Sequence, residues 1–261
     1  MQVFKSIIIA ISMFSKIPVP TLEWDEKSMK YAIAAFPLIG VFVGGLCILW
    51  NRLMFQLEFS NVVTSIGLLL IPILVTGGIH LDGLCDTADA LSSRAPRERK
   101  LQILKDPHIG AFGVINLVVY LIAYFAFIFE LPKSARMVAC FAFSLVLSRV
   151  LSGLSIIVFR SSSDSESSIG STFSNLASKK TCVALLIIVG LAASFFMIYY
   201  GSFPGIVAIF LVFITFIIYK LYIIRQFGGV SGDLAGWLVQ MCELMSLIGI
   251  VIASHVIEVL I

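Results

Sequence analysis

Charged residues are scarce in this chain. Only 13% of its 261 residues are Asp, Glu, Lys or Arg, whereas a soluble domain carries about 25%. So few charges cannot cover a surface that faces water on every side, which excludes a soluble globular protein. Intrinsic disorder is excluded as well, because the chain is 59% hydrophobic with a mean hydropathy of +1.05, and disorder goes with low hydrophobicity and high charge.

Net charge and paired cysteines are also lacking. The formal net charge is only +3, which is too weak a bias to indicate a nucleic-acid partner. None of the five cysteines stands in a CxxC pair, so we expect neither a disulfide scaffold nor a zinc site. A free thiol in an apolar run behaves as a small hydrophobic side chain.

The sequence does contain long apolar stretches. A membrane-spanning helix uses roughly 20 residues, and seven stretches approach that length: Tyr31–Trp50, Asn61–Gly78, Phe112–Leu131, Arg136–Phe159, Thr181–Tyr200, Phe203–Tyr222 and Gly236–Val256. No ten-residue alternation indicates a β-barrel, and an open sheet cannot satisfy its backbone hydrogen bonds in lipid. We therefore predict an all-α, polytopic membrane bundle of about seven transmembrane helices that forms one domain over residues 1–261.

A further apolar stretch, Ser6–Phe14, is too short to span a bilayer. With a lysine ahead of it, this stretch looks like a short signal peptide. However, Lys16, Pro18 and Pro20 follow where small residues would mark a cleavage site. We expect a retained segment that lies at the membrane interface or is re-entrant.

Lys and Arg are distributed unevenly between the segments that flank the seven stretches. Fourteen lie in one alternating set of segments and three in the other. By the positive-inside rule, the N-terminus, the loop His80–Ala111 and the Ser-rich loop Arg160–Lys180 are cytoplasmic, and with seven spans the C-terminus lies outside. We interpret the Ser-rich loop as a mobile linker and place the protein in the plasma (inner) membrane as a multi-pass protein.

The strongest chemical signal is a set of three aspartates, Asp82, Asp86 and Asp89, within Gly77–Leu91. Their spacing of i, i+4 and i+7 places them on one face of a helix. Like charges this close repel one another, so the arrangement costs stability unless a cation lies among them. Oxygen ligands of this kind suit Mg²⁺, which usually takes one or two carboxylates together with water and substrate phosphates. The alternative is a solvated acidic face, but the residues between the aspartates are apolar or small.

Two other segments on the same side are candidates for phosphate contact. Lys105 and Asp106 precede Gly110 at the start of a span, where a lysine can hold a phosphate as a point charge or can simply snorkel to the interface. Gly232 and Asp233 open the last span, and a glycine before a helix allows close backbone approach to an anion. Because the charge count places all these residues on the cytoplasmic side, we predict that they share one site.

Two ionisable residues, Arg149 and Glu243, fall within predicted spans. Their depths of about 16 and about 11 Å, at a rise of ~1.5 Å per residue, allow long side chains to meet. Buried charges in lipid are costly and usually paired. Both a structural ion pair and a contact with substrate agree with the sequence, and we predict that the two side chains approach within pairing distance.

On these motifs the chain resembles the cobalamin synthase family of integral-membrane adenosylcobinamide-GDP ribazoletransferases. The resemblance covers essentially the whole chain. Three matches are specific. A glycine–histidine–aspartate pattern is matched by Gly77–Leu91, a lysine–aspartate–glycine segment by Leu104–Gly113, and a final glycine–aspartate motif by Gly229–Glu243. Weaker matches are Phe14–Pro20, Phe36–Gly40 and Gly170–Phe173.

The resemblance implies an enzyme that transfers the cobinamide phosphate moiety of adenosylcobinamide-GDP to α-ribazole, or to its 5′-phosphate, and releases GMP. This is the nucleotide loop assembly stage of cobalamin biosynthesis. The expected partners are these two substrates and the lipid bilayer, and the sequence does not decide whether the chain forms a homo-oligomer.

The resemblance also implies roles for the candidate residues. Mg²⁺ on the diphosphate would be held by Asp82, Asp86 and Asp89, with Asp233 as a further ligand or as a group that supports the ligands. The base near the ribose hydroxyl would be Asp89 or His80, and Lys105 would stabilise charge on the phosphates. The predicted substrate-binding residues are Lys105, Asp106, Gly110, Gly232, Arg149 and Glu243.

Two other functions agree with part of the sequence. A CDP-alcohol lipid head-group phosphotransferase shares the aspartate-rich helix, but we would expect it to show an Ala-Arg pair where this chain has Leu84 and Cys85. A membrane transporter would line its pathway with Arg149 and Glu243, but it leaves the cytoplasmic aspartates unexplained.

Reporter fusions test the predicted orientation. We expect a reporter that is active only in the cytoplasm to work when inserted within His80–Ala111 and to fail at the C-terminus, because basic residues are retained on the cytoplasmic side. A loop that reports an external location would contradict both the orientation and the placement of the site.

Overall fold

A computed structural model describes residues 2–22, 29, 31–162 and 179–260. These residues are almost entirely helical, with no strand among them and one isolated bridge between Ser161 and Val230. The helices are α1 Gln2–Phe14, α3 Ala32–Ala35, α4 Pro37–Gln56, α5 Asn61–Thr76, α6 Ile79–Ser92, α7 Arg97–Ile103, α8 Ala111–Glu130, α9 Ala135–Val158, α11 Lys179–Gly201, α12 Phe203–Ile218, the π-helical η1 Tyr219–Ile223, α13 Ile224–Phe227 and α14 Gly232–Leu260. Most of the predicted linker Arg160–Lys180 lies outside the described residues.

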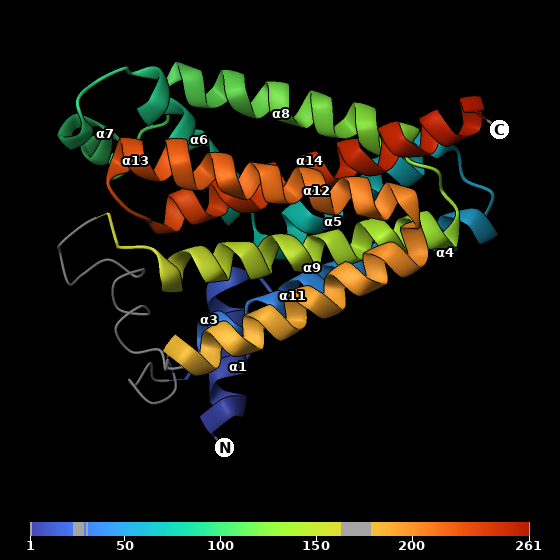
Figure 1. Ribbon diagram of the computed structural model, residues 1–261, viewed down its shortest axis with the longest axis horizontal. Coiled ribbons are helices and arrows are strands. Elements are labelled where there is room, and N and C mark those ends of the chain that lie inside the picture. Colours follow the sequence, from blue (N-terminus) through green and yellow to red (C-terminus); the bar gives the residue numbers. More distant parts are fainter. Residues whose placement is uncertain (1, 23–28, 30, 163–178, 261) are drawn as a thin grey trace.

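Within the described part of the chain, six helical segments are long and apolar enough to cross a membrane: Ala32–Gln56, Ala111–Glu130, Ala135–Val158, Lys179–Gly201, Phe203–Phe227 and Gly232–Leu260. They run side by side along the long axis of the molecule (Figure 1). The predicted polytopic helical bundle is therefore confirmed, and six of the seven predicted spans correspond to these segments.

At the seventh predicted span, Asn61–Gly78, the structure differs from the prediction. Its helix, α5, ends at Thr76 after 16 residues, and it meets the length and composition of a span only together with α6, to which it is bent by 89°. Gly77 and Gly78 cause the bend, because both adopt positive φ angles of 66° and 80°, a conformation that glycine adopts without steric cost. The bend turns the aspartate-bearing helix across the end of the bundle.

The N-terminal helix α1 has 13 residues, too few for a membrane-spanning helix. It runs across the direction of the long helices (Figure 1) and packs against α3. Ile9 and Ala10 on α1 are buried in a small core that also includes Ile33 and Leu186. The short apolar segment predicted from the sequence is thus a helix fastened to the bundle.

Helices α9 and α14 form the centre of the bundle. α9 packs against α4, α11 and α14, and α14 also packs against α6 and α12. Glycines allow the closest contacts, since a Cβ on Gly40 would lie 2.7 Å from the carbonyl oxygen of Leu145, and one on Gly249 would lie 2.8 Å from the Cα of Ala208. Close backbone approach of this kind favours helix association in lipid, where the hydrophobic effect does not drive it.

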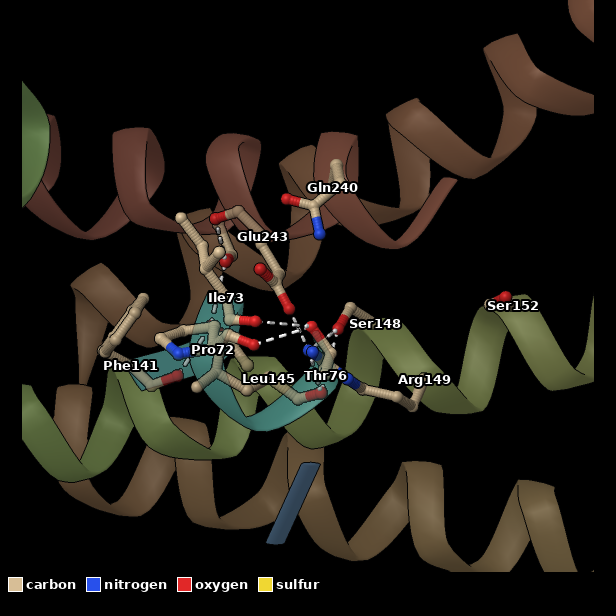
Figure 2. Close-up of polar contacts among 12 residues, drawn as sticks. Pro72, Ile73, Thr76, Phe141, Leu145, Ser148, Arg149, Ser152, Gln240 and Glu243 are labelled. Carbon is tan, nitrogen blue, oxygen red and sulfur yellow. Dashed lines mark hydrogen bonds and ion pairs between the residues drawn. The ribbon is translucent and has the colours of Figure 1, made fainter. Parts of the chain in front are cut away.

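A buried ion pair joins the two central helices. Nη1 of Arg149 on α9 donates to Oε1 of Glu243 on α14, and the two side chains are only 0% and 1% exposed. The same nitrogen donates to the carbonyl of Leu145 and to Oγ of Ser148, each at 3.0 Å. Figure 2 shows the two charged side chains pointing toward each other between the helices. The predicted pairing is confirmed.

Double substitution tests what this pair contributes to stability. We expect Arg149→Met and Glu243→Met each to lower the free energy of unfolding by about 3–5 kcal/mol, because each leaves one buried charge without its partner, whereas the double variant should lose much less. Thermal unfolding of detergent-solubilised protein measures the three values. Simple additivity of the two single effects would contradict a coupled pair.

Candidate active site

Two glycines bring the start of α6 against the start of α14. A Cβ on Gly83 would lie 2.5 Å from the carbonyl oxygen of Asp233, and a Cβ on Gly236 would lie 3.3 Å from the Cα of His80. The absence of a side chain at both positions lets the two backbones approach this closely. Two motifs that are far apart in the sequence therefore meet at one end of the bundle.

A cavity of about 170 Å³ lies at this contact, and we call it the apolar cavity. Its polar lining consists of His80, Asp82, Ser152, Gly232 and Asp233. The rest of its wall is mainly apolar and comes from α1, the α3–α4 segment, the start of α6 and the end of α9: Met13, Phe14, Ile33, Phe36, Ile79 and Ile156. Four predicted site residues, His80, Asp82, Gly232 and Asp233, thus line one cavity.

A second cavity of about 580 Å³, which we call the Lys16 cavity, adjoins the apolar cavity at Asp82. Asp82 and Ile79 line both cavities. The side chain of Lys16 lies over Gly77, where a Cβ would be 2.5 Å from Cγ of the lysine, and the Lys16 backbone N–H donates to the carbonyl of Val75 at 2.8 Å. Asp82 therefore borders both the apolar cavity and a larger one that Lys16 lines.

The four predicted metal ligands share one electrostatic environment. Asp86 is half-buried and lies in the field of Asp82, Asp233 and Asp89. Among the described residues, no three His, Cys, Asp or Glu side chains converge closely enough to hold a metal by themselves. The carboxylates nevertheless fit Mg²⁺, because this ion usually takes one or two protein carboxylates and completes its shell with water and phosphates. Their mutual repulsion favours cation binding.

The carboxylate of Asp89 is engaged by the start of α8. Oδ2 accepts the backbone N–H of Gly110 at 2.7 Å, and Oδ1 accepts that of Gly113 at 2.8 Å. A Cβ on Gly113 would lie 2.5 Å from Oδ2, so the glycine is required for this contact. Because the first N–H groups of a helix have no partner within the helix, Asp89 caps α8 from another helix. Asp89 and Gly110, which we predicted only to share one site, are thus joined by a direct hydrogen bond.

The glycine segment before α14 is held by contacts with Arg97 and with the chain just after α9. Gly228 has a φ of 75° and packs against the guanidinium of Arg97, whose Nε donates to the carbonyl of the preceding residue at 2.9 Å. Val230 exchanges two backbone hydrogen bonds with the chain just after α9. In contrast, a Cβ on Gly232 would meet no atom within 4 Å among the described residues. Of these glycines, Gly232 is the one that faces the apolar cavity.

Lys105 and Asp106 lie elsewhere, in the exposed turn after α7. Oδ1 of Asp106 accepts the backbone N–H of His108 at 3.0 Å and lies 2.8 Å from the Nδ1 of its ring. The hydrogen bond from the His108 backbone, and to a lesser extent the one with its ring, lowers the pKa of the Asp106 carboxyl below its usual value. Neither residue lines the apolar cavity, and their contact with substrate stays a prediction.

Arg149 and Glu243 are paired with each other and do not line the apolar cavity. Glu243 instead borders a small void that also touches Gln240 and Tyr120. The hydroxyl of Tyr120 donates to the side-chain amide oxygen of Gln240 at 2.6 Å. The structural ion pair is therefore present, while a contact of either side chain with substrate stays a prediction.

Several residues of the site were not predicted individually. Lys16, Phe14 and Phe36 lie within or beside the weaker family matches, Phe14–Pro20 and Phe36–Gly40, so a signal for them existed in the sequence. Ser152 gave no such signal, because serines on a buried helix are also typical of helix contacts. Its Oγ donates to the carbonyl of Ala235 at 3.0 Å, which fastens α9 to α14 beside the cavity.

Comparison with known proteins gives a consistent result. The sequence model of the family described as cobalamin-5-phosphate synthase matches residues 6–251. The chain is similar to an adenosylcobinamide-GDP ribazoletransferase of Lachnoclostridium phytofermentans, with 40% identity over 98% of this chain and 97% of the relative. It is also similar to the proteins of the same name from Clostridium botulinum strain Alaska E43, with 32% identity over 94% and 96%, and from Listeria monocytogenes strain EGD-e, with 32% identity over 95% and 98%. No solved structure matches the chain.

The role of Asp89 as a cap can be tested by Asp89→Asn. The amide replaces one of the two acceptor oxygens, so one N–H at the start of α8 loses its partner, and the loss of a cap costs about 1 kcal/mol. We expect a lower midpoint of thermal unfolding that added Mg²⁺ does not restore. Asp82→Asn, at an exposed position, is the matched control: it removes a repelling charge and no cap, so its midpoint should not fall below that of the wild type. An Asp89→Asn protein that is inactive but fully stable would instead favour a role as base or metal ligand.

Proposed function

The chain belongs to the cobalamin-5-phosphate synthase family, and from this premise we propose that it is an adenosylcobinamide-GDP ribazoletransferase. A ribose hydroxyl oxygen of α-ribazole, or of its 5′-phosphate, attacks the phosphorus nearest to the cobinamide. The new P–O bond forms as the bond to the GMP oxygen breaks, GMP leaves, and the hydroxyl proton passes to a carboxylate of the site. The family comparison does not favour the CDP-alcohol phosphotransferase or the transporter.

The observation that carries this proposal is the meeting of the two acidic motifs at the apolar cavity. Phosphoryl transfer needs positioning and neutralisation of charge more than it needs covalent chemistry by the protein. Asp82 and Asp233 lie at the edge of a cavity whose interior is apolar, and Asp86 lies close to both. This arrangement places anionic chemistry beside a compartment suited to an uncharged organic group.

We propose that one or two of the carboxylates of Asp82, Asp86 and Asp233 hold Mg²⁺ together with water and substrate phosphates. When bound, the ion supplies charge neutralisation at the transferring phosphate. The protein orients the carboxylates by packing Gly83 against Asp233 and by fastening the loop before α14 through Arg97. Lys16, which borders the adjoining cavity, supplies a point charge for the diphosphate.

The two sequence candidates for the base, Asp89 and His80, differ in their surroundings. Asp89 uses both oxygens to hold the start of α8, so we propose that it positions the site and contributes to metal binding only through its remaining lone pairs. His80 is 4% exposed, and its Nε2 has no hydrogen-bond partner among the described residues. We propose that this nitrogen contacts the acceptor nucleoside.

We propose further that the enzyme works in the plasma membrane with this site facing the cytoplasm. The starts of α8 and α14 lie at the same end of the bundle as the site, and the loops before them carry the excess of basic residues. Such an excess is typical of cytoplasmic loops.

The proposed activity is tested with purified, detergent-solubilised protein, adenosylcobinamide-GDP, α-ribazole and Mg²⁺, followed by mass spectrometry for adenosylcobalamin and GMP. We expect product with Mg²⁺, none with chelator, and little with Ca²⁺, which is larger and less strict in geometry. Asp82→Asn and Asp86→Asn should each lower turnover by several orders of magnitude while the protein stays folded, because each removes a charged ligand.

Glu98→Gln is the matched control, since it removes an exposed carboxylate on α7 away from the cavity. Its turnover should equal that of the wild type. Full activity in both the Asp82 and the Asp86 variants would show that these carboxylates form only a solvated acidic face.

A further inference from the structure

We propose that the apolar cavity binds the bicyclic heteroaromatic base of the acceptor nucleoside, with the ribose at the edge formed by Asp82, Gly232 and Asp233. This inference rests on the proposed function. It assigns the cavity to the acceptor and leaves the diphosphate of the donor outside it, on the carboxylates and the Lys16 cavity.

The size of the cavity limits what can enter. Its volume is about 170 Å³, well below the roughly 300–1,000 Å³ of sites that enclose a drug-sized ligand. An apolar cavity of roughly 150 Å³ can bind one benzene ring. The corrin macrocycle of the donor is therefore far too large, whereas one planar ring system of the acceptor fits.

The walls of the cavity suit an aromatic guest. The rings of Phe14 and Phe36 have centroids 4.3 Å apart and are tilted by 36°, and Phe36 meets the imidazole of His80 edge-to-face at 5.6 Å. Aromatic groups gain from offset and edge-to-face contacts at these separations. A planar base placed against this cluster would add another such contact.

The polar groups of the cavity favour a base that makes few hydrogen bonds. His80 lines the cavity, its Nε2 is buried without a hydrogen-bond partner among the described residues, and Ser152 already donates to the carbonyl of Ala235. Guanine, the base of the leaving nucleotide, carries several donors and acceptors that would stay unsatisfied here, which is costly. The dimethylbenzimidazole of α-ribazole has one ring nitrogen acceptor, which the Nε2–H tautomer of His80 can satisfy.

The position of the carboxylates agrees with this assignment. Asp82 and Asp233 line the same cavity as the aromatic cluster, so a base that enters it leaves its ribose at the carboxylates. The attacking hydroxyl then lies where we propose that the phosphates bind. Binding energy from the base, which takes no part in the reaction, would thereby orient the hydroxyl.

Filling the cavity tests the inference. Ala235 lines it, and Ala235→Leu adds three carbon atoms to its wall. We expect the KM for α-ribazole, and its Kd in equilibrium dialysis with radiolabelled α-ribazole, to rise roughly tenfold or more. The KM for adenosylcobinamide-GDP should stay unchanged. Ala192→Leu, on the exposed face of α11, adds the same volume away from the cavity and should alter neither constant.

An enlarged cavity provides a second measurement should the filled variant fail to fold. Ile156→Ala should accept a riboside with a bulkier tricyclic base that the wild type rejects. His80→Gln, which keeps a donor, should retain a lower KM for α-ribazole than His80→Leu, whereas a proton-transfer role would lower kcat in both. An unchanged α-ribazole KM in Ala235→Leu and no new selectivity in Ile156→Ala would overturn the inference, as would a rise in the KM for adenosylcobinamide-GDP alone.

Failure of the inference is distinct from failure of the proposed function. If wild-type protein forms no adenosylcobalamin, the proposed function fails, and dialysis still reports whether α-ribazole binds and whether Ala235→Leu prevents it. If wild-type protein turns over but the cavity variants leave the acceptor constants unchanged, the function stands and the assignment of the cavity is wrong.

Discussion

The contact between Gly83 on α6 and the backbone of Asp233 on α14 is the constraint on which the site depends. It brings carboxylates from two distant segments to one edge of a cavity, at the expense of repulsion among like charges. Any larger residue at position 83 would push the helices apart. Because α6 reaches this position only through the 89° bend after α5, the two left-handed glycines at 77 and 78 are part of the same constraint.

The surrounding bundle makes this contact rigid. Arg149 and Glu243 join α9 to α14 in the centre of the bundle, and Ser152 fastens the same two helices beside the cavity. Asp89 ties α6 to the start of α8. Polar interactions thus join the four helices around the site. Hydrogen bonds between helices are one of the forces that hold a bundle together in lipid, where the hydrophobic effect does not drive helices to associate.

Much of this could be predicted from the sequence, because the relevant signals are local or obligatory. Apolar length gives the spans, the cost of lone buried charges predicts the pairing of Arg149 and Glu243, and the basic loops place the acidic motifs on one side. The roles of Gly77, Gly78 and Asp89 could not be identified from the sequence in this way. A glycine needed for a bend and one needed for phosphate approach look alike in a sequence, and a carboxylate that caps a distant helix looks like a metal ligand. The cavity wall also depends on α1 and on Phe36 between α3 and α4, and the contact of Phe36 with His80 on α6 is tertiary.

We propose that a divalent cation joins the carboxylates of α6 and α14 to the donor diphosphate. Mn²⁺ prefers the same oxygen ligands as Mg²⁺ and can be followed by electron paramagnetic resonance. With Mn²⁺ and adenosylcobinamide-GDP, the wild-type protein should show hyperfine coupling from phosphorus to the bound ion, and Asp82→Asn should lose it. Coupling of equal strength in the variant, or no protein-bound Mn²⁺ in the wild type, would contradict the account.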